Sequence, residues 1–223
     1  IHKGFGNSNV ILGRLLYTGI DNEIQLISID GGGLRNAIPR EAHAVVSVKN
    51  VEEFLQKLET LKTEILEEFT SVEKDLSISF EKMSASEQGL STEDSKKIIL
   101  ALKSAHNGVY RMSPDVENLV ETSNNIARVE LKNGALKILN LSRSSVESNK
   151  MAVAEQLKSV FELAGMEVEF SGSYPGWKPK PGAEIIKIMT EIYEKDFVAK
   201  PHVVACHAGL ECGIIGANYP KME

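Results

Sequence analysis

Apolar residues in the first half of the chain recur with two different periods. Spacings of three and four residues predict helices, because they put apolar side chains on one face, and strict alternation predicts strands with one buried face. The pattern predicts a helix over 7–17, strands over 23–30 and 42–49, a helix over 51–71 and a strand over 76–82. With one further strand upstream, this order is a split β-α-β unit of the ferredoxin-like type.

The second half shows a related order. The pattern predicts a helix over 91–106, a strand over 117–131, a partner strand over 135–143, a helix over 148–164 and a strand over 166–171. Asn133-Gly134 is a strong signal for a two-residue hairpin turn, and Gly165 suits the left-handed position after a helix. We therefore expect an α/β (α+β) fold of two ferredoxin-like halves, with an antiparallel sheet and helices on one face.

The composition changes after Ser171. Residues 172–182 contain three of the seven prolines and the only tryptophan, Trp177, which indicates a domain boundary. A helix over 183–195 and a short apolar run over 202–205 follow, and these elements are too few to form a core. We expect one domain over 1–172, with halves of about 1–85 and 86–172, and a partial α/β segment of a second domain over 173–223.

Composition and charge narrow the class of protein. The 223 residues include 31 acidic and 25 basic side chains without a basic block, so we expect no nucleic-acid partner. No apolar run approaches the roughly 18 residues of a membrane helix, so we expect no membrane partner. Two cysteines, Cys206 and Cys212, are too few for a disulfide framework and favour the cytoplasm. The start at Ile1 without Met, together with the incomplete elements, predicts a fragment of a longer protein.

The densest group of reactive side chains lies near the end of the chain. Cys206, His207, Glu211 and Cys212 fall within seven residues and could ligate a metal or form a nucleophilic site. Their spacing matches neither a two-cysteine zinc knuckle nor a zincin helix. A glycine-containing loop after a buried strand, with the cysteines as small core residues, is the alternative.

Two further groups suit the binding of an anion. Arg35 and Asn36 stand just before a predicted strand, where a guanidinium and an amide could bind a substrate carboxylate, or could belong to a surface turn. A regular hairpin that turns at Asn133-Gly134 places Asn124 opposite Arg143. That pair could also bind an anionic group, and polar cross-strand pairing at the surface is the alternative.

Six motifs occur in series, at 1–9, 35–42, 122–125, 143–145, 174–179 and 207–213. Together they resemble the cytosolic aminoacyl-histidine dipeptidases, a family of dinuclear zinc peptidases that cleave Xaa-His dipeptides such as carnosine. The resemblance spans the whole chain. It implies a catalytic domain interrupted by a lid domain that closes over the dipeptide.

The resemblance also implies roles for residues of this chain. Residues 1–172 correspond to the lid and 173–223 to part of the catalytic domain, with most metal ligands and the general-base Glu outside the chain. The implied substrate-binding residues are Asn124, Arg143, His207, Glu211 and Asn36, whereas no catalytic residue and no metal ligand is expected here. The parent enzyme would hold two zinc ions, and the fragment alone would bind none and be inactive.

A second class of function stays open at this point. The chain could be a stand-alone ferredoxin-like module that binds a small ligand or forms a dimer. An exposed edge strand could pair two copies, so a homodimer is a possible state in either interpretation.

Overall fold

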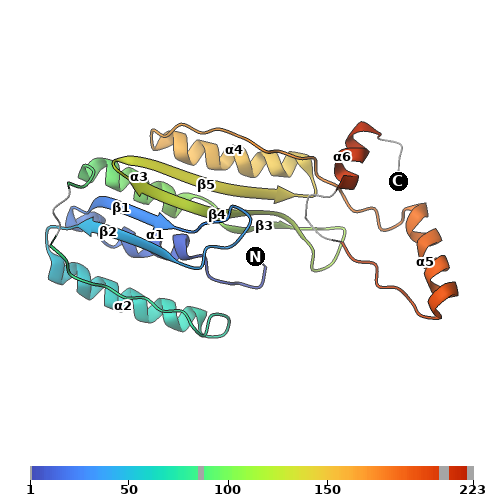
Figure 1. The fold of residues 1–223 in the computed structure, drawn as a ribbon, viewed down its shortest axis with the longest axis horizontal. Coiled ribbons are helices and arrows are strands. Elements are labelled where there is room, and N and C mark those ends of the chain that lie inside the picture. The colour runs from blue at the N-terminus through green and yellow to red at the C-terminus, as the bar shows by residue number, and fades with distance from the viewer. Residues whose placement is uncertain (1, 85–87, 206–210, 220–223) are drawn as a thin grey trace. The chain divides into compact units, whose positions relative to one another are not determined.

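The computed structural model describes residues 2–84, 88–205 and 211–219. Within these ranges the fold is mixed α+β, with a five-stranded, mostly antiparallel sheet and six α-helices (Figure 1). The elements in chain order are α1 (Ser8–Tyr17), β1 (Gln25–Gly31), β2 (Ala42–Ser47), α2 (Val51–Phe69), α3 (Thr92–Ser104), β3 (Gly108–Met112), β4 (Val120–Lys132), β5 (Ala135–Ser144), α4 (Glu147–Leu163), α5 (Glu184–Phe197) and α6 (Glu211–Asn218). No described helix is both long enough and apolar enough to span a membrane.

The chain divides into two compact units. Unit 1 comprises Ile1–Gly108, Asn124–Leu141 and Gln156–Val168, and unit 2 comprises Val109–Ser123, Ser142–Glu155 and Glu169–Glu223. Strands β4 and β5 and helix α4 each contribute residues to both units. The sequence pattern predicts a different division of the chain, with a single domain boundary at residue 172, and that boundary stays a prediction.

The sheet has the strand order β2-β1-β4-β3, and β5 also pairs with β4. In unit 1, β1 runs antiparallel to both β2 and β4, and its pairing with β2 shifts by one residue between Leu26 and Ser28. At this irregularity the Leu26 N–H donates to Ser95 Oγ at 2.9 Å, and the Leu26 carbonyl accepts from Leu90 N at 2.8 Å. The backbone polar groups of the buried Leu26 are therefore satisfied outside the ladder.

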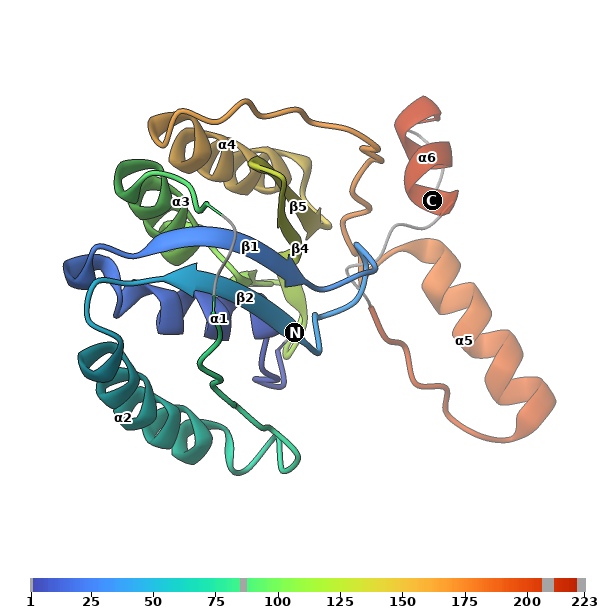
Figure 2. The same ribbon diagram turned by 60° about the vertical axis from the view of Figure 1, so that its left-hand side comes forward.

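The core of unit 1 lies where the predicted apolar faces meet. Figure 2 shows α1 beside the pair of strands β1 and β2. The buried residues of this core include Ile11, Leu15 and Leu16 of α1, Ile24, Leu26 and Ile29 in and before β1, Phe54, Leu58 and Ile65 of α2, and Ile98, Ile99 and Leu102 of α3. The predicted helices and hairpin are confirmed, with ends that differ by a few residues.

Two predicted strands, over 76–82 and 166–171, are wrong, because the structure assigns no strand pairing to either segment. Leu76, Ile78 and Phe80 are half-buried and the residues between them are exposed, and the same holds around Met166 and Val168. The first segment runs back along α2, where Lys62 Nζ lies 5.6 Å from the centre of the Phe80 ring (Figure 1). Period-two alternation reports which side chains are buried, and an extended segment can bury one face without ladder hydrogen bonds.

Candidate functional site

The five predicted substrate-binding residues fall into different parts of the structure. Asn36 lies exposed in a turn after β1 and Asn124 is fully buried in β4, and both belong to unit 1. Arg143 lies near the end of β5 and Glu211 is the first residue of α6, and both belong to unit 2. His207 lies outside the described residues. Unit 1 thus contains one candidate pair and unit 2 another.

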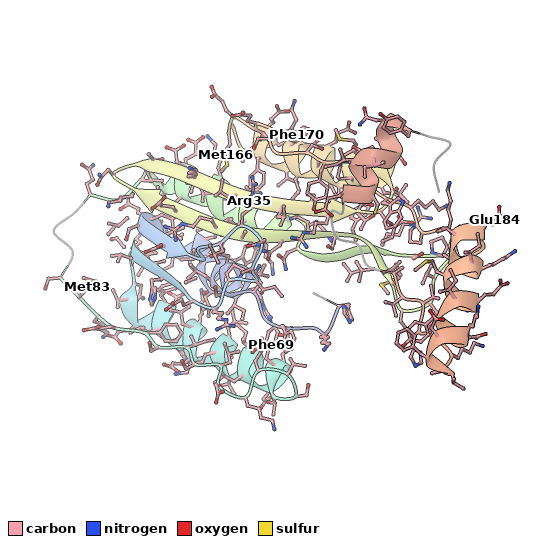
Figure 3. The ribbon with its side chains drawn as sticks, turned by 45° about the vertical axis from the view of Figure 1, so that its right-hand side comes forward. Arg35, Phe69, Met83, Met166, Phe170 and Glu184 are labelled. Atoms are coloured by element: carbon pink, nitrogen blue, oxygen red, sulfur yellow. The ribbon has the colours of Figure 1, made fainter. Side chains whose placement is uncertain are left out.

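Residues 32–41, which we call the 32–41 loop, connect β1 to β2 and contain Asn36. Pro39 O accepts from Ser8 N at 3.2 Å, and Gly32 N donates to Glu41 O at 3.1 Å. The tip of the loop, from Leu34 to Ala37, is exposed. Figure 3 labels Arg35 on this tip. The loop is therefore fixed at its base, whereas Arg35 and Asn36 are accessible to a ligand.

Arg128 of β4 provides another contact at the base of this loop. Its guanidinium donates to Gly32 O at 2.6 Å, pairs with Asp30, and lies 2.9 Å from Glu130 Oε1. The hydrogen bond to Asp30, followed by the one to Glu130, raises the pKa of Arg128 above its ordinary value. Arg128 was not among the predicted site residues, because only the strand pairing brings its two acidic partners together.

A network of buried asparagines holds the tip of the loop. Asn7 caps α1 with its Oδ1, which accepts from Asn9 N and Val10 N. Its Nδ2 lies 3.0 Å from Oδ1 of both Asn107 and Asn125. Asn125 Nδ2 in turn donates to Ala37 O at 2.7 Å. The network joins the start of α1, strand β4 and the residue that follows Asn36.

Replacing Asn7 by alanine is expected to lower the free energy of unfolding by about 2 to 3 kcal/mol. The change removes the cap of α1 and also leaves the amide oxygens of the half-buried Asn107 and the buried Asn125 without this donor. Urea unfolding of the chain measures the effect.

Asn50→Ala is the matched control for this prediction. Asn50 also caps a helix, but its side chain accepts from Glu53 N at an exposed site, so a loss of about 1 kcal/mol is expected. Equal losses in the two variants would show that the buried network adds nothing to the cap.

The side chain of Asn124 is already engaged within unit 1. Its Nδ2 donates to His106 O at 2.7 Å and lies 3.3 Å from Asn140 Oδ1. An amide nitrogen carries two hydrogens, so both have acceptors. Asn124 therefore has less capacity to bind a further anion than an amide at an exposed position such as Asn36.

The β4–β5 hairpin departs from a regular register near its open end. A regular hairpin at Asn133-Gly134 would place Thr122 opposite Ser145, but Thr122 Oγ1 lies 2.8 Å from Ser144 Oγ. Ser145 N likewise donates to Glu121 O, at 3.1 Å. These contacts show an offset of one residue. The neighbour relation of Asn124 and Arg143, which was inferred from a regular register, stays a prediction.

Arg143 is half-buried at this irregular end of the hairpin. Its Nε is buried and has no hydrogen-bond partner among the described residues. A buried polar atom without a partner is costly, and a guanidinium has five donors in a planar fork that fits a carboxylate. Arg143 is thus a candidate residue with a donor free to bind an anionic group.

The cysteine, histidine and glutamate cluster is described only in part. Glu211 and Cys212 lie exposed in the first turn of α6, whereas Cys206 and His207 lie outside the described residues. The carboxylate of Glu211 suits the positive end of the helix dipole. Within the described ranges, no group of three or more His, Cys, Asp or Glu side chains could hold a metal ion.

Comparison with known proteins gives two extended similarities, although no protein-family model matches the chain. The chain is 35% identical over 226 residues to the cytosol non-specific dipeptidase of Escherichia coli K12, covering 100% of this chain and 47% of that protein. It also matches the crystal structure of the aminoacylhistidine dipeptidase from Vibrio alginolyticus, with a TM-score of 0.92, 37% identity, and coverage of 100% of this chain and 46% of that one. The chain spans about half the length of these relatives.

Proposed function

The chain is homologous to cytosol non-specific dipeptidase and aminoacylhistidine dipeptidase, and on this premise we propose that it is part of a zinc-dependent dipeptidase that hydrolyses Xaa-His dipeptides. The observation that supports this proposal is similarity along the entire chain, in both sequence and fold. The name of the Escherichia coli relative supports a cytoplasmic location. Full coverage of the chain at this identity favours the dipeptidase over a stand-alone binding module.

In this proposal residues 1–172 form the lid, built as two ferredoxin-like halves, and 173–223 belong to the catalytic domain. Since the chain spans about half the length of its relatives, we assign the zinc ligands and the general base, as the resemblance implies, to the remainder of the longer protein. Zinc bound there would activate the attacking water and polarise the scissile carbonyl. The residues of this chain would bind and orient the dipeptide.

Arg143 is the residue that we assign to the substrate carboxylate. Its buried, unpartnered Nε and half-buried position suit a carboxylate that arrives with the substrate. A bidentate pair would fix the orientation of the dipeptide and hold the scissile carbonyl toward the metal centre. Asn124 is assigned a weaker contact, to the substrate carboxylate or to the oxyanion. Asn36, His207 and Glu211 are assigned to other parts of the substrate.

The amphipathic helix α5 supports the assignment of 173–223 to a domain that a further part of the protein completes. None of its residues is buried. Ile185, Ile188, Met189 and Ile192 recur at helical spacing and are each at least 44% exposed, and Figure 3 shows Glu184 at the start of this helix. A contiguous apolar stripe of this kind is normally covered by a partner surface.

A peptidase assay tests the proposed function. The full-length protein that contains this chain, supplied with zinc, is expected to hydrolyse Ala-His and carnosine, because it would provide both the metal site and the lid. The 223-residue chain under the same conditions is expected to release no histidine. Turnover by the chain alone at enzyme-like rates would contradict the division of roles, and an inactive full-length protein would contradict the dipeptidase assignment.

A further inference from the structure

Lys150 is a buried cation in unit 2 that the proposed function does not use. It lies in α4 and is only 8% exposed. Its Nζ donates to Tyr174 O at 2.5 Å, to Ser173 Oγ at 3.1 Å and to Glu147 Oε2 at 2.9 Å. An ammonium group has three hydrogens, so this site satisfies all of them. A lysine buried in this way is stabilised only while these three acceptors stay in place.

Two of the three acceptors, Ser173 Oγ and Tyr174 O, belong to a segment that we call the 173–177 segment, from Ser173 to Trp177. Glu147 Oε2 accepts from Gly176 N at 3.2 Å as well as from Lys150, so one carboxylate joins the lysine to the segment. Lys150 Nζ also lies 5.9 Å from the centre of the Tyr174 ring, within the range of a cation–π contact. The start of α4 therefore holds the segment through both backbone and side-chain groups.

Two glycines allow backbones to approach closely on either side of this segment. A Cβ added at Gly176 would lie 2.7 Å from Ser145 O, and one added at Gly213 would lie 3.0 Å from Pro175 O. The segment thus packs between the end of the hairpin and helix α6. Arg143 lies two residues before Ser145, and Glu211 lies two residues before Gly213. Both candidate residues of unit 2 are therefore attached to backbones that contact this segment.

We propose that Lys150 is a positioning residue that, by holding the 173–177 segment against the start of α4, sets the placement of Arg143 relative to Glu211. This inference deepens the proposed function and depends on it for the roles of Arg143 and Glu211. The hold of Lys150 on the segment does not depend on it. The two parts can therefore be tested separately.

The first test follows the only tryptophan of the chain, Trp177, which lies in the segment. Lys150→Met keeps the aliphatic stem and removes the three donors, which should release the 173–177 segment. Acrylamide is therefore expected to quench the fluorescence of Trp177 more strongly in the variant than in the unchanged chain. Lys158→Met on the same helix is the control, because Lys158 is 43% exposed and makes a surface pair with Glu162 at 3.5 Å. Unchanged quenching in a folded Lys150→Met chain would overturn the proposal.

The second test uses kinetics of the full-length protein with Ala-His. Lys150→Met is expected to lower kcat/KM by about 10- to 100-fold, mostly through a raised KM, since small displacements of binding groups have effects of this size. Zinc content should not change, and Lys158→Met should behave as the unchanged protein. Altered quenching of Trp177 with unchanged kinetics would limit Lys150 to a structural role. That result would overturn the proposal that Lys150 sets the placement of Arg143 relative to Glu211. A lack of peptidase activity in every form, with altered quenching, would refute the proposed function instead.

A pair of glycine variants covers the case in which Lys150→Met does not fold. Gly176→Ala should displace the segment from Ser145. It should therefore reproduce both the stronger quenching of Trp177 fluorescence and the raised KM for Ala-His. Gly182→Ala is the control in the same part of the chain, because an added Cβ there comes within 4 Å of no atom in the part of the chain that the structure describes. Equal behaviour of the two glycine variants would overturn the proposal without any reliance on Lys150.

Discussion

Gly32→Ala is expected to lower the free energy of unfolding by about 3 to 5 kcal/mol. Gly32 has a φ of +75°, which side chains other than glycine rarely adopt, and an added Cβ would lie 2.0 Å from Ala127 O. Ala127 is a fully buried residue of β4, so its backbone cannot move away easily. Gly32 O also accepts from Arg128 and Gly32 N donates to Glu41 O, so a shift of Gly32 would disturb the base of the 32–41 loop.

The adjacent Gly33 provides a control for this prediction. An added Cβ at Gly33 meets no atom of the described residues within 4 Å, so Gly33→Ala is expected to change the free energy of unfolding by less than about 0.5 kcal/mol. Urea unfolding followed by circular dichroism compares the two variants. Similar stabilities would mean that the loop adapts to the added methyl group and that its base is not rigid.

The helices and the hairpin could be predicted because their sequences obey simple periods. Asn7 and Asn50 are the N-caps of α1 and α2, and asparagine is among the residues preferred at this position. Strand β3 was missed, since its side chains are half-buried or exposed and therefore show no alternation of apolar and polar residues. Helix α6 was also missed, because two of its eight residues are glycines, which disfavour a helix in isolation.

Strand β4 shows why the surroundings of the candidate site could not be predicted. Its polar run from Thr122 to Asn125 reads as surface, yet all four residues are buried. Their amide and hydroxyl groups are satisfied by partners distant in sequence, such as Asn7 for Asn125 and Ser144 for Thr122. Contacts between residues distant in sequence leave no periodic pattern in the strand itself. An interpretation of the sequence based on polarity therefore suggests that Thr122 to Asn125 are exposed.

Lys150 is the missed residue for which the sequence contains a signal. It lies at helical spacing from Val153, Leu157 and Phe161, which are all buried. A lysine on the apolar face of a helix predicts either a paired buried charge or a side chain that reaches the surface. Only the structure identifies the partners, because Ser173 and Tyr174 follow the helix after a reversal of the chain.

Arg143→Ala in the full-length protein is expected to lower kcat/KM for Ala-His by about 100-fold, or about 2.7 kcal/mol, without loss of zinc. The proposed guanidinium–carboxylate contact supplies binding and orientation, whereas the metal ligands are assigned outside this chain. Arg14→Ala is the control, since Arg14 makes an exposed pair with Glu68 at 2.6 Å. Steady-state kinetics and zinc content of the purified variants measure the two effects.

The decisive comparison uses a substrate without the carboxylate. If Arg143 binds that group, the unchanged protein should cleave the C-terminal amide of Ala-His about 100-fold less efficiently than Ala-His, and Arg143→Ala should add almost nothing to this loss. The two changes are non-additive because each removes one partner of the same ion pair. Additive losses would mean that Arg143 contacts a part of the substrate other than the carboxylate. Loss of zinc from a folded Arg143→Ala variant would mean that Arg143 stabilises the metal site instead.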